Sequence, residues 1–424
     1  MSEPRITQIL ENFLINGIPV GTTGASNYSN DSFGRQRVGI PSTQYEYDFQ
    51  YNKAPLIWDE RATGTGVATH VPDESSVQLS TGSTVDTNGI TRQTFQYFRY
   101  RPGKSLEFQE TFVFGAITEN VIKRVGYFDD NDGIFLEQDG ENSVYNLGLR
   151  SSTTGSPVDI LIPQASWNLD IFDGSGSSGI VADFTKSQIF SATIQWLGVG
   201  SVLCGFVIDR TFHPAHIFNN ANSLDKVYMK TANLPVRYEI FNRGIAGGID
   251  TMKQICATVI TNGGIDEEMS YTHAVQNLAE KFSIGTSFTS LITIRPKATF
   301  NSITNRGQIL PITVEVNNTG TGNLIYQLRY NGTLGGTPSY NSAGVNSITE
   351  FDIAGTLVTG GEVLDSGQVI SSNQVKAGQR STVGIKYPIA LNINGASPKI
   401  LTLAVRAVAG TVDAMGSITF AENY

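Results

Sequence analysis

The feature that most constrains the fold is a tract of short segments, from about Gln93 to Thr261, in which apolar and polar residues alternate. In the segment Leu106–Phe114 the apolar side chains fall on even positions, and the same spacing recurs at Phe190–Trp196 and Val202–Ile208. A period of two places one face of each segment in a core and the other in water. The tract therefore predicts the antiparallel strands of a β-sandwich.

Turn residues separate these segments at intervals that suit β-hairpins. The pairs that close hairpins most readily are Asp132-Gly133, Asp139-Gly140, Asp209-Arg210 and Asn262-Gly263. A stretch rich in Ser, Thr and Gly, from Thr63 to Asn88, is predicted to be a loop. Strand patterns return at Leu291 and continue to the C-terminus, which predicts a second sandwich.

The sequence as a whole predicts an all-β fold of two antiparallel, jelly-roll-like β-sandwich domains behind a short N-terminal arm. Between the domains, Tyr271, Ala274, Val275 and Leu278 have helical spacing, so a helical linker is expected there. The predicted divisions are an arm at 1–40, a concanavalin-like sandwich at 41–265, the linker at 266–288 and a C-terminal sandwich at 289–424.

The N-terminal arm carries the pattern of a short amphipathic helix over residues 4–15. Its apolar stripe consists of Ile6, Ile9, Leu10, Phe13 and Leu14. A helix of about three turns is marginal alone and must dock its stripe on something. Docking on an assembly partner and packing on the chain's own domain are both open, and the first makes these five residues an attachment site.

The net charge of −9 and the absence of a Lys/Arg cluster argue against nucleic-acid binding and against adsorption to anionic membranes. No apolar run approaches the ~20 residues that span a bilayer, and the N-terminus lacks the pattern of a signal peptide. We therefore expect synthesis in a cytoplasm. Cys204 and Cys256 lie in apolar strand segments and are expected to be free thiols.

The densest acidic cluster contains Asp129, Asp130 and Asp132, which could bind Ca²⁺ or could simply form a charged turn between strands. The spacing does not match a helix-loop-helix calcium site, so no cofactor is expected, with Ca²⁺ as the alternative. His213 and His216 could share a metal only if Pro214 bends the strand. No nucleophile elbow or phosphate loop occurs, and the chain is expected not to be an enzyme.

Aromatic residues offer another kind of site. Trp58, Trp167, Trp196 and the alternating row from Tyr45 to Tyr51 could stack on sugars, although aromatic residues in strands more often fill a core.

Several sequence strings resemble a poorly characterised family of virion proteins found in tailed phages and large double-stranded DNA viruses. The resemblance is strong over residues 33–264 and loose elsewhere, and it rests on these strings: Phe33-Gly34-Arg35-Gln36-Arg37-Val38, Leu56-Ile57-Trp58-Asp59, Tyr100-Arg101-Pro102-Gly103-Lys104-Ser105, Arg124-Val125-Gly126-Tyr127-Phe128-Asp129-Asp130, Trp196-Leu197-Gly198-Val199-Gly200, Gly205-Phe206-Val207-Ile208-Asp209, Phe218-Asn219-Asn220-Ala221-Asn222 and Asn233-Leu234-Pro235-Val236-Arg237-Tyr238-Glu239. It implies a tail-fibre or capsid-decoration protein and transfers no catalytic residue. The segment from Trp196 to Asp209 is also similar to a hairpin of concanavalin/laminin-G-like jelly rolls, which is an analogy of fold alone.

These observations lead to the expectation of a virion structural protein, made in the host cytoplasm, that docks on capsid or tail proteins through its arm. Self-association, as a homotrimer, would cover open sheet edges. The alternative is a carbohydrate-binding module that recognises host surface glycans.

Overall fold

The computed structural model describes residues 14–15, 18–19, 41–263, 270–277, 282–371, 378–384 and 387–424. Throughout these residues the regular structure is β, apart from the short 3-10 turns η2 (Pro72–Glu74) and η3 (Gln164–Ser166). The predicted all-β, antiparallel class is confirmed. Among the described residues there is no helix with the length and apolar character needed to cross a membrane.

The chain divides into two compact units. The first is drawn from residues 1–53, 62–91 and 100–265, and the second from residues 54–61, 92–99 and 266–424. The sequence-based boundaries place residues 41–265 in one domain, whereas the compact units assign the two short segments 54–61 and 92–99 to the second unit.

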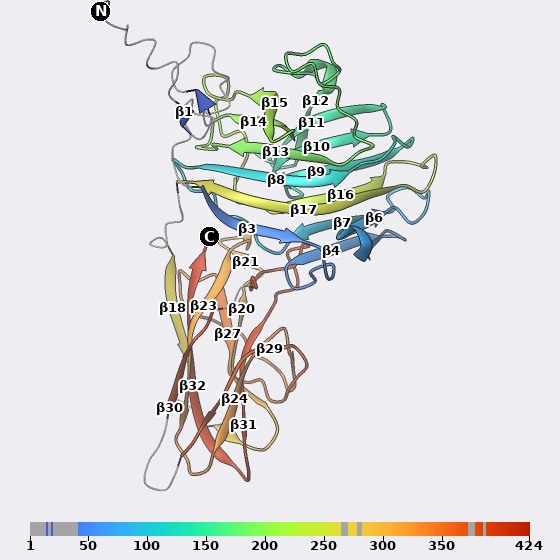
Figure 1. Cartoon of the computed structure of the whole chain (residues 1–424). Coiled ribbons are helices and arrows are strands. Elements are labelled where there is room, and N and C mark those ends of the chain that lie inside the picture. The colour runs from blue at the N-terminus through green and yellow to red at the C-terminus, as the bar shows by residue number, and fades with distance from the viewer. Residues whose placement is uncertain are drawn as a thin grey trace, which may run out of the picture. The chain divides into compact units, whose positions relative to one another are not determined.

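The first unit is built on two sheets, whose strands other than β5 are labelled in Figure 1. The β9 sheet has the strand order β12 (Val158–Pro163), β11 (Val144–Ser151), β10 (Gly133–Asp139), β9 (Val121–Phe128), β16 (Val236–Asn242), β7 (Gly89–Thr94) and β4 (Trp58–Thr63). The β8 sheet has the order β15 (Thr211–Phe218), β14 (Val202–Ile208), β13 (Gln188–Ile194), β8 (Ser105–Val113), β17 (Thr251–Asn262), β6 (Ser76–Ser80) and β5 (Val67–Val71), with β3 (Pro41–Asp48) paired to β17. Outside both sheets, β1 (Leu14–Ile15) pairs with β2 (Ile18–Pro19).

The alternating residues pack the two sheets against each other. Phe108 of β8 stacks on Tyr127 of β9 with ring centroids 5.6 Å apart, and Phe190 of β13 contacts Phe108 edge-on. These rings have no exposed surface. The period of two therefore sets which side of each strand faces the core, and it leaves the neighbouring residues on the two outer faces.

The hairpin between β14 and β15 shows how the turn signals act. Ile208 pairs with Thr211, and the two residues between them, Asp209 and Arg210, have φ of 50° and 64°. Two consecutive left-handed residues are the backbone of a type I′ turn, whose twist matches the flanking strands. The predicted hairpin is confirmed here.

The stretch predicted to be a loop, Thr63–Asn88, contains the hairpin β5–β6. Val77 and Leu79 of β6 are fully buried. A strand of five residues with only two apolar positions gives a weak periodic signal, and its pairing with β17 decides the structure. The loop prediction is wrong for these strands.

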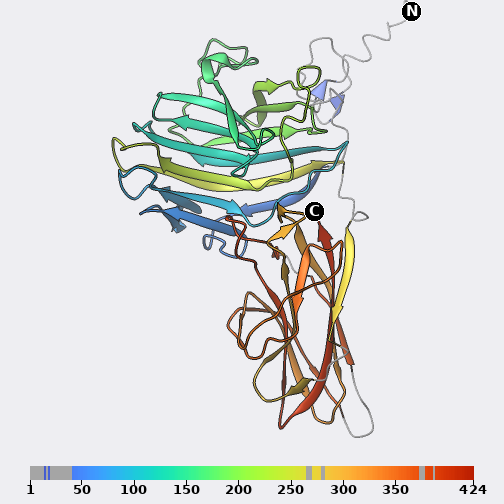
Figure 2. The ribbon, with the colours of Figure 1, turned by 180° about the vertical axis from the view of Figure 1, so that it is seen from behind.

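The second unit is also a two-sheet sandwich. Its long strands run along roughly one common direction (Figures 1 and 2). The β32 sheet has the order β18 (Tyr271–Gln276), β32 (Val412–Asn423), β23 (Gln308–Asn318) and β30 (Gly378–Thr382), with β19 (Phe282–Ile284) also on β32. The β31 sheet has the order β26 (Asn341–Ser342), β27 (Thr349–Asp352), β20 (Thr289–Pro296), β31 (Leu401–Ala407), β24 (Leu324–Tyr330) and β29 (Glu362–Val369). Two small pairs complete it: β21 (Thr299–Phe300) with β22 (Ile303–Thr304), and β25 (Thr333–Leu334) with β28 (Val358–Thr359).

Aliphatic side chains fill the space between these two sheets. Leu291, Leu403 and Ile418, from three strands, have no exposed surface and belong to one cluster. Ile312 departs from its alternating neighbours because the register of β23 shifts between Pro311 and Thr313, and this bulge turns its side chain outward to 38% exposure.

The helical linker predicted at residues 266–288 is wrong where the structure describes a strand. Tyr271–Gln276 is strand β18, paired antiparallel with β32. Only Val275 of this strand is buried, while Tyr271 is 57% exposed. The backbone hydrogen bonds to β32 override a helical spacing that rested on few apolar residues. Residues 264–269 and 278–281 lie outside the described residues.

Candidate binding site

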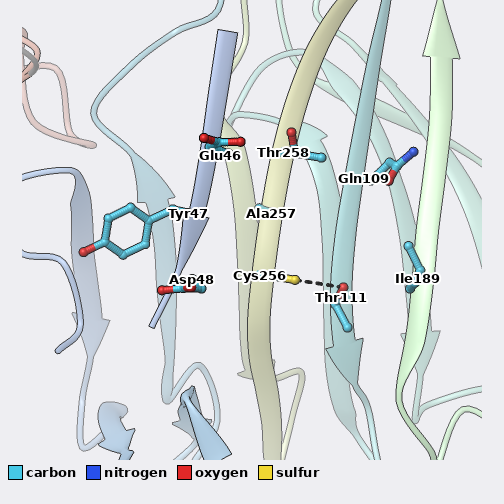
Figure 3. Close-up of a pocket in the computed structure, with 9 residues that line it drawn as sticks. All are labelled: Glu46, Tyr47, Asp48, Gln109, Thr111, Ile189, Cys256, Ala257 and Thr258. Atoms are coloured by element: carbon cyan, nitrogen blue, oxygen red, sulfur yellow. Dashed lines mark hydrogen bonds between the residues drawn. The ribbon is translucent and has the colours of Figure 1, made fainter. Parts of the chain in front are cut away.

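A trough crosses the outer face of the β8 sheet where strands β3, β17, β8 and β13 lie side by side (Figure 3). Phe108 and Phe112 of β8 point into the core, so the alternating residues Gln109 and Thr111 point outward into the trough. The trough has a volume of about 560 Å³. Its lining residues are Glu46, Tyr47, Asp48, Gln109, Thr111, Ile189, Cys256, Ala257 and Thr258.

Two carboxylates stand along one side of the trough. Glu46 and Asp48 are exposed and lie two residues apart on β3, which places both on the same face of the strand. Their register partners on β17 are Thr258 and Cys256. Within the described residues neither carboxylate forms an ion pair; Asp48 accepts one long hydrogen bond of 3.4 Å from the backbone N–H of Gln50. The carboxylate oxygens of Glu46 and Asp48 therefore face solvent, and few protein donors compete with a ligand for them.

Tyr47 differs from its two neighbours in direction. Figure 3 shows its ring extending past β3 on the side away from β17, while Glu46 and Asp48 lie on the same strand beside the trough.

The floor of the trough is polar and mixed in hydrogen-bonding capacity. The Thr258 hydroxyl donates to the carbonyl oxygen of Tyr45 at 2.9 Å, which leaves its oxygen as an acceptor. The Thr111 hydroxyl oxygen accepts from the Cys256 thiol at 3.2 Å, which leaves its own hydrogen as a donor (Figure 3). Gln109 donates through Nε2 to Glu107 at 2.9 Å and keeps its amide oxygen for other partners.

The outer face of the β9 sheet carries a different arrangement, which we call the arginine layer. It consists of three arginines and the four carboxylates that pair with them: Arg124, Arg150, Arg237, Glu137, Glu239, Asp159 and Asp130. At its centre Arg124 bridges Glu137 at 2.7 Å and Glu239 at 3.1 Å, and all three side chains are at most 7% exposed.

Ring contacts and a flanking ion pair complete the arginine layer. Arg124 lies 4.8 Å and Arg150 lies 5.4 Å from the centroid of Phe135, as cation–π contacts do. Burial alone would lower the pKa of Arg150, but its hydrogen bond with Asp159 and the charges of Glu239, Asp159 and Asp130 outweigh burial and raise that pKa. Burial alone would raise the pKa of Asp159, but the hydrogen bond and the charge of Arg150 lower it. Each arginine is paired with at least one carboxylate of the layer, so the layer offers few unpaired cationic groups to a ligand.

The predicted calcium ligands are placed in a turn whose oxygens already have protein partners. Asp132 accepts hydrogen bonds from the backbone N–H groups of Ser152 at 3.1 Å and Lys230 at 2.9 Å. Asp129 accepts from the N–H of Asp132 at 3.0 Å, and Asp130 pairs with Arg237 at 2.7 Å. The described residues contain no group of three or more His, Cys, Asp or Glu arranged to hold a metal ion. These contacts occupy several oxygens of the cluster, and Ca²⁺ binding there stays a prediction.

The attachment residues fall mostly outside the described structure. Ile6, Ile9, Leu10 and Phe13 lie among the residues that are not described, and Leu14 lies in β1, paired with Pro19 of β2. The helix predicted over residues 4–15 is therefore wrong at its end, Leu14–Ile15, because that segment pairs as a strand. Docking by this arm stays a prediction.

The other candidates from the sequence are mainly structural. Trp58 and Trp167 are buried, and the Trp196 indole N–H donates to the carbonyl oxygen of Met229 at 3.1 Å. The ring of His216 accepts from the backbone N–H of Asn168 at 3.2 Å, and burial lowers its pKa. Cys204 and Cys256 are free, as predicted.

The trough residues were missed by the sequence analysis although a signal was present. The tyrosine row was noted at odd positions, and the residues between them, Glu46 and Asp48, share the opposite face of the strand. The alternation indicated which residues face outward, but not that β3 lies beside β17, since that pairing joins segments about 210 residues apart.

Comparison with known proteins gives relatives by fold only. No family model matches this sequence, and no curated protein matches it. A glycoside hydrolase family protein from Mycobacterium thermorestibile is similar at 12% identity and a TM-score of 0.36, covering 51% of this chain and 99% of that one. The Emp47p carbohydrate recognition domain is similar at 12% identity and a TM-score of 0.34, covering 53% and 97%. A Bacteroides ovatus GH16 protein of a mixed-linkage glucan locus is similar at 10% identity and a TM-score of 0.33, covering 51% and 99%.

These comparisons correct one expectation and give no support to another. Glycoside hydrolases stand among the similar structures, which contradicts the expectation that this chain is not an enzyme. The physical reason is that glycoside hydrolysis needs two suitably spaced carboxylates rather than a sequence motif, so the lack of motifs excludes nothing. The resemblance to virion proteins receives no support from the comparisons.

Proposed function

We propose that this protein binds carbohydrate in the trough on the outer face of its β8 sheet. The observation that carries the proposal is the pair of carboxylates, Glu46 and Asp48, exposed on one strand and without an ion pair among the described residues. Charged acceptors form the stronger hydrogen bonds to hydroxyl donors. Sugar rings present hydroxyls that both donate and accept, and the trough offers both kinds of partner.

The shape of the trough fits an extended ligand better than a compact one. Its lining residues come from four strands that lie side by side (Figure 3). Its volume of about 560 Å³ lies within the range of about 300–1,000 Å³ that small-molecule sites occupy. Ile189 supplies apolar contact for the C–H face of a sugar between the polar groups. We therefore expect a short oligosaccharide as the ligand.

The experiment is a screen of the full chain against immobilised glycans, followed by calorimetric titration of the oligosaccharides that bind. Glu46→Gln and Asp48→Asn keep the size of each side chain and remove its charge, so each should weaken binding by about tenfold. Asp209→Asn is the matched control, because it removes one negative charge at the exposed β14–β15 turn, toward the opposite edge of the same sheet. Equal affinity of all three variants would contradict the proposal, as would the absence of any bound glycan.

Hydrolysis is a second candidate, favoured by the same pair of carboxylates. Residues two apart on a strand have Cα atoms about 6.5 Å apart, and glycosidases hold their two carboxyl groups about 5–9.5 Å apart. The test is the appearance of new reducing ends when the protein is incubated with the glycans it binds. Loss of that release in both Glu46→Gln and Asp48→Asn would show that the pair cleaves its ligand.

The virion role rests on sequence resemblance and is proposed on that ground alone. A fibre or capsid decoration that carries a glycan-binding trough would recognise a host surface, so the two proposals are compatible. Deletion of residues 1–16 should leave folding and glycan binding intact while abolishing incorporation into particles. Light scattering of the purified chain tests the predicted trimer, and repeating it with a chelator tests Ca²⁺ dependence.

A further inference from the structure

Two arginines in the second unit share one aromatic ring. The guanidinium carbon of Arg329 lies 4.8 Å from the centroid of Phe288, and that of Arg406 lies 5.5 Å from it. Arg329 belongs to β24 and Arg406 to β31, which are neighbours in the β31 sheet; in their register Arg329 faces Thr402 and Arg406 faces Ile325, so the two arginines approach the ring from positions four residues apart. Both side chains are partly exposed, and that of Arg329 lies on the face of β24 opposite its buried residues.

Neutral oxygens orient these guanidinium groups. Arg329 donates through Nε at 2.9 Å and Nη2 at 2.6 Å to the amide oxygen of Gln327, and through Nη1 at 3.1 Å to the carbonyl oxygen of Gly360. Arg406 donates at 3.5 Å to the carbonyl oxygen of Ala407. Within the described residues neither arginine forms an ion pair, so two positive charges stay without a neutralising carboxylate.

Three other arginines of the molecule are paired with carboxylates instead. Arg124 and Arg237 in the first unit, and Arg295 in the second, each contact a carboxylate within 3.5 Å. The chain as a whole carries a net charge of −9, so carboxylates are plentiful. Ring stacking and hydrogen bonds to amide and carbonyl oxygens hold Arg329 in place while preserving its charge.

We propose that Arg329 and Arg406 form a binding site for an oxyanion, either a carboxylate or a sulfate group. A guanidinium presents several N–H donors in one plane and binds such groups through paired hydrogen bonds. Because three donors of Arg329 are already used, the anion would be shared with Arg406 beside the same ring. In a carbohydrate ligand this chemistry corresponds to a uronic acid or a sulfated sugar; a free inorganic anion has the same chemistry. The site lies in the second unit and does not depend on the trough proposal.

The test titrates the full chain with three probes at low ionic strength and follows binding by calorimetry. The probes are sodium sulfate, a trisaccharide of galacturonic acid and a neutral trisaccharide of glucose. Arg329→Gln and Arg406→Gln remove one charge each. Arg380→Gln is the matched control, since Arg380 is an exposed arginine of β30 that makes one weak hydrogen bond to Thr313 among the described residues. Thermal unfolding of each variant verifies that it is folded.

The proposal predicts that sulfate or the acidic trisaccharide binds and that the double variant Arg329→Gln/Arg406→Gln loses this binding by at least about tenfold. Arg380→Gln should stay near wild type. Preference for the acidic over the neutral trisaccharide would assign the site to a sugar-borne anion, whereas binding of sulfate alone would assign it to an inorganic one. Failure of both anions to bind, or equal affinity of the double variant and Arg380→Gln, would overturn the proposal. The outcome of the glycan-binding experiment on Glu46→Gln and Asp48→Asn does not bear on this test, because the trough and the arginine pair use different residues.

Discussion

The two outer faces of the first sandwich treat their charged residues in opposite ways. On the β9 sheet, Arg124 is surrounded by carboxylates that neutralise it, and the group is buried. On the β8 sheet, Glu46 and Asp48 are exposed and have no such neighbour among the described residues. Both faces come from the same period-two pattern, so the difference lies in which residues the strand pairing brings together. A closed charge network stabilises a sheet, whereas an open one can bind a ligand.

The largest effect is expected when the closed network is broken. Arg124→Met leaves Glu137 and Glu239 buried without their shared cation, and this should cost about 3–5 kcal/mol of the free energy of unfolding. Urea unfolding of the purified variant measures the loss. Adding Glu137→Gln and Glu239→Gln to the same variant should restore part of it, because no unpaired buried charge then remains. A loss below about 1 kcal/mol in the single variant would mean that the network is not structural.

A buried carboxyl on the inner face of β8 gives the next effect, and it depends on pH. Burial raises the pKa of Glu110 well above its ordinary value. The folded protein then holds a proton that the unfolded chain loses above about pH 4.5, so stability falls as the pH rises from that value toward the raised pKa.

Glu110→Gln tests this by removing the titration. Between the ordinary and the raised pKa the wild type should lose about 1.4 kcal/mol of the free energy of unfolding per pH unit relative to the variant. Unfolding curves at pH 4, 6 and 8 are the measurement. Parallel stability curves for the two proteins would show that Glu110 does not titrate with unfolding.

The smallest effect on stability is expected in the open trough. Glu46→Gln and Asp48→Asn should each change the free energy of unfolding by no more than about 0.5 kcal/mol, because exposed side chains with few partners contribute little to folding. The same variants should weaken glycan binding, which separates a binding role from a structural one. A larger loss of stability, comparable with that of Arg124→Met, would remove the contrast between the two faces.

Much of the fold could be predicted from local patterns. The alternation at Leu106–Phe114 identified the inward face of β8, and Asp209-Arg210 identified a hairpin turn with the required left-handed backbone. The prediction failed where local patterns were weak, as at the hairpin β5–β6. It failed also where pairing overrode spacing, as at Tyr271–Gln276, which pairs with the last long strand of the chain.

The candidate site could be predicted only in part for the same reason. Alternation places Glu46 and Asp48 together on one face of a strand, but the strand pairing that sets them beside Thr258 joins distant segments. The acidic cluster at Asp129–Asp132 was visible in the sequence. The backbone N–H groups that donate hydrogen bonds to Asp132 belong to Ser152 and Lys230, which are distant in sequence and could not be predicted. Sequence composition shows which groups are present; only the fold shows which of them already have partners.

The most direct test of the central claim is a methyl NMR titration of the full chain with the strongest glycan from the screen. Thr111, Thr258 and Ile189 carry methyl groups in residues that line the trough, while Ile292 and Ile418 lie in the core of the second unit. Binding in the trough predicts saturable shifts of the three trough methyls, absent in Glu46→Gln, with the core methyls unchanged. A bound glycan that leaves those three methyls unshifted would contradict the account.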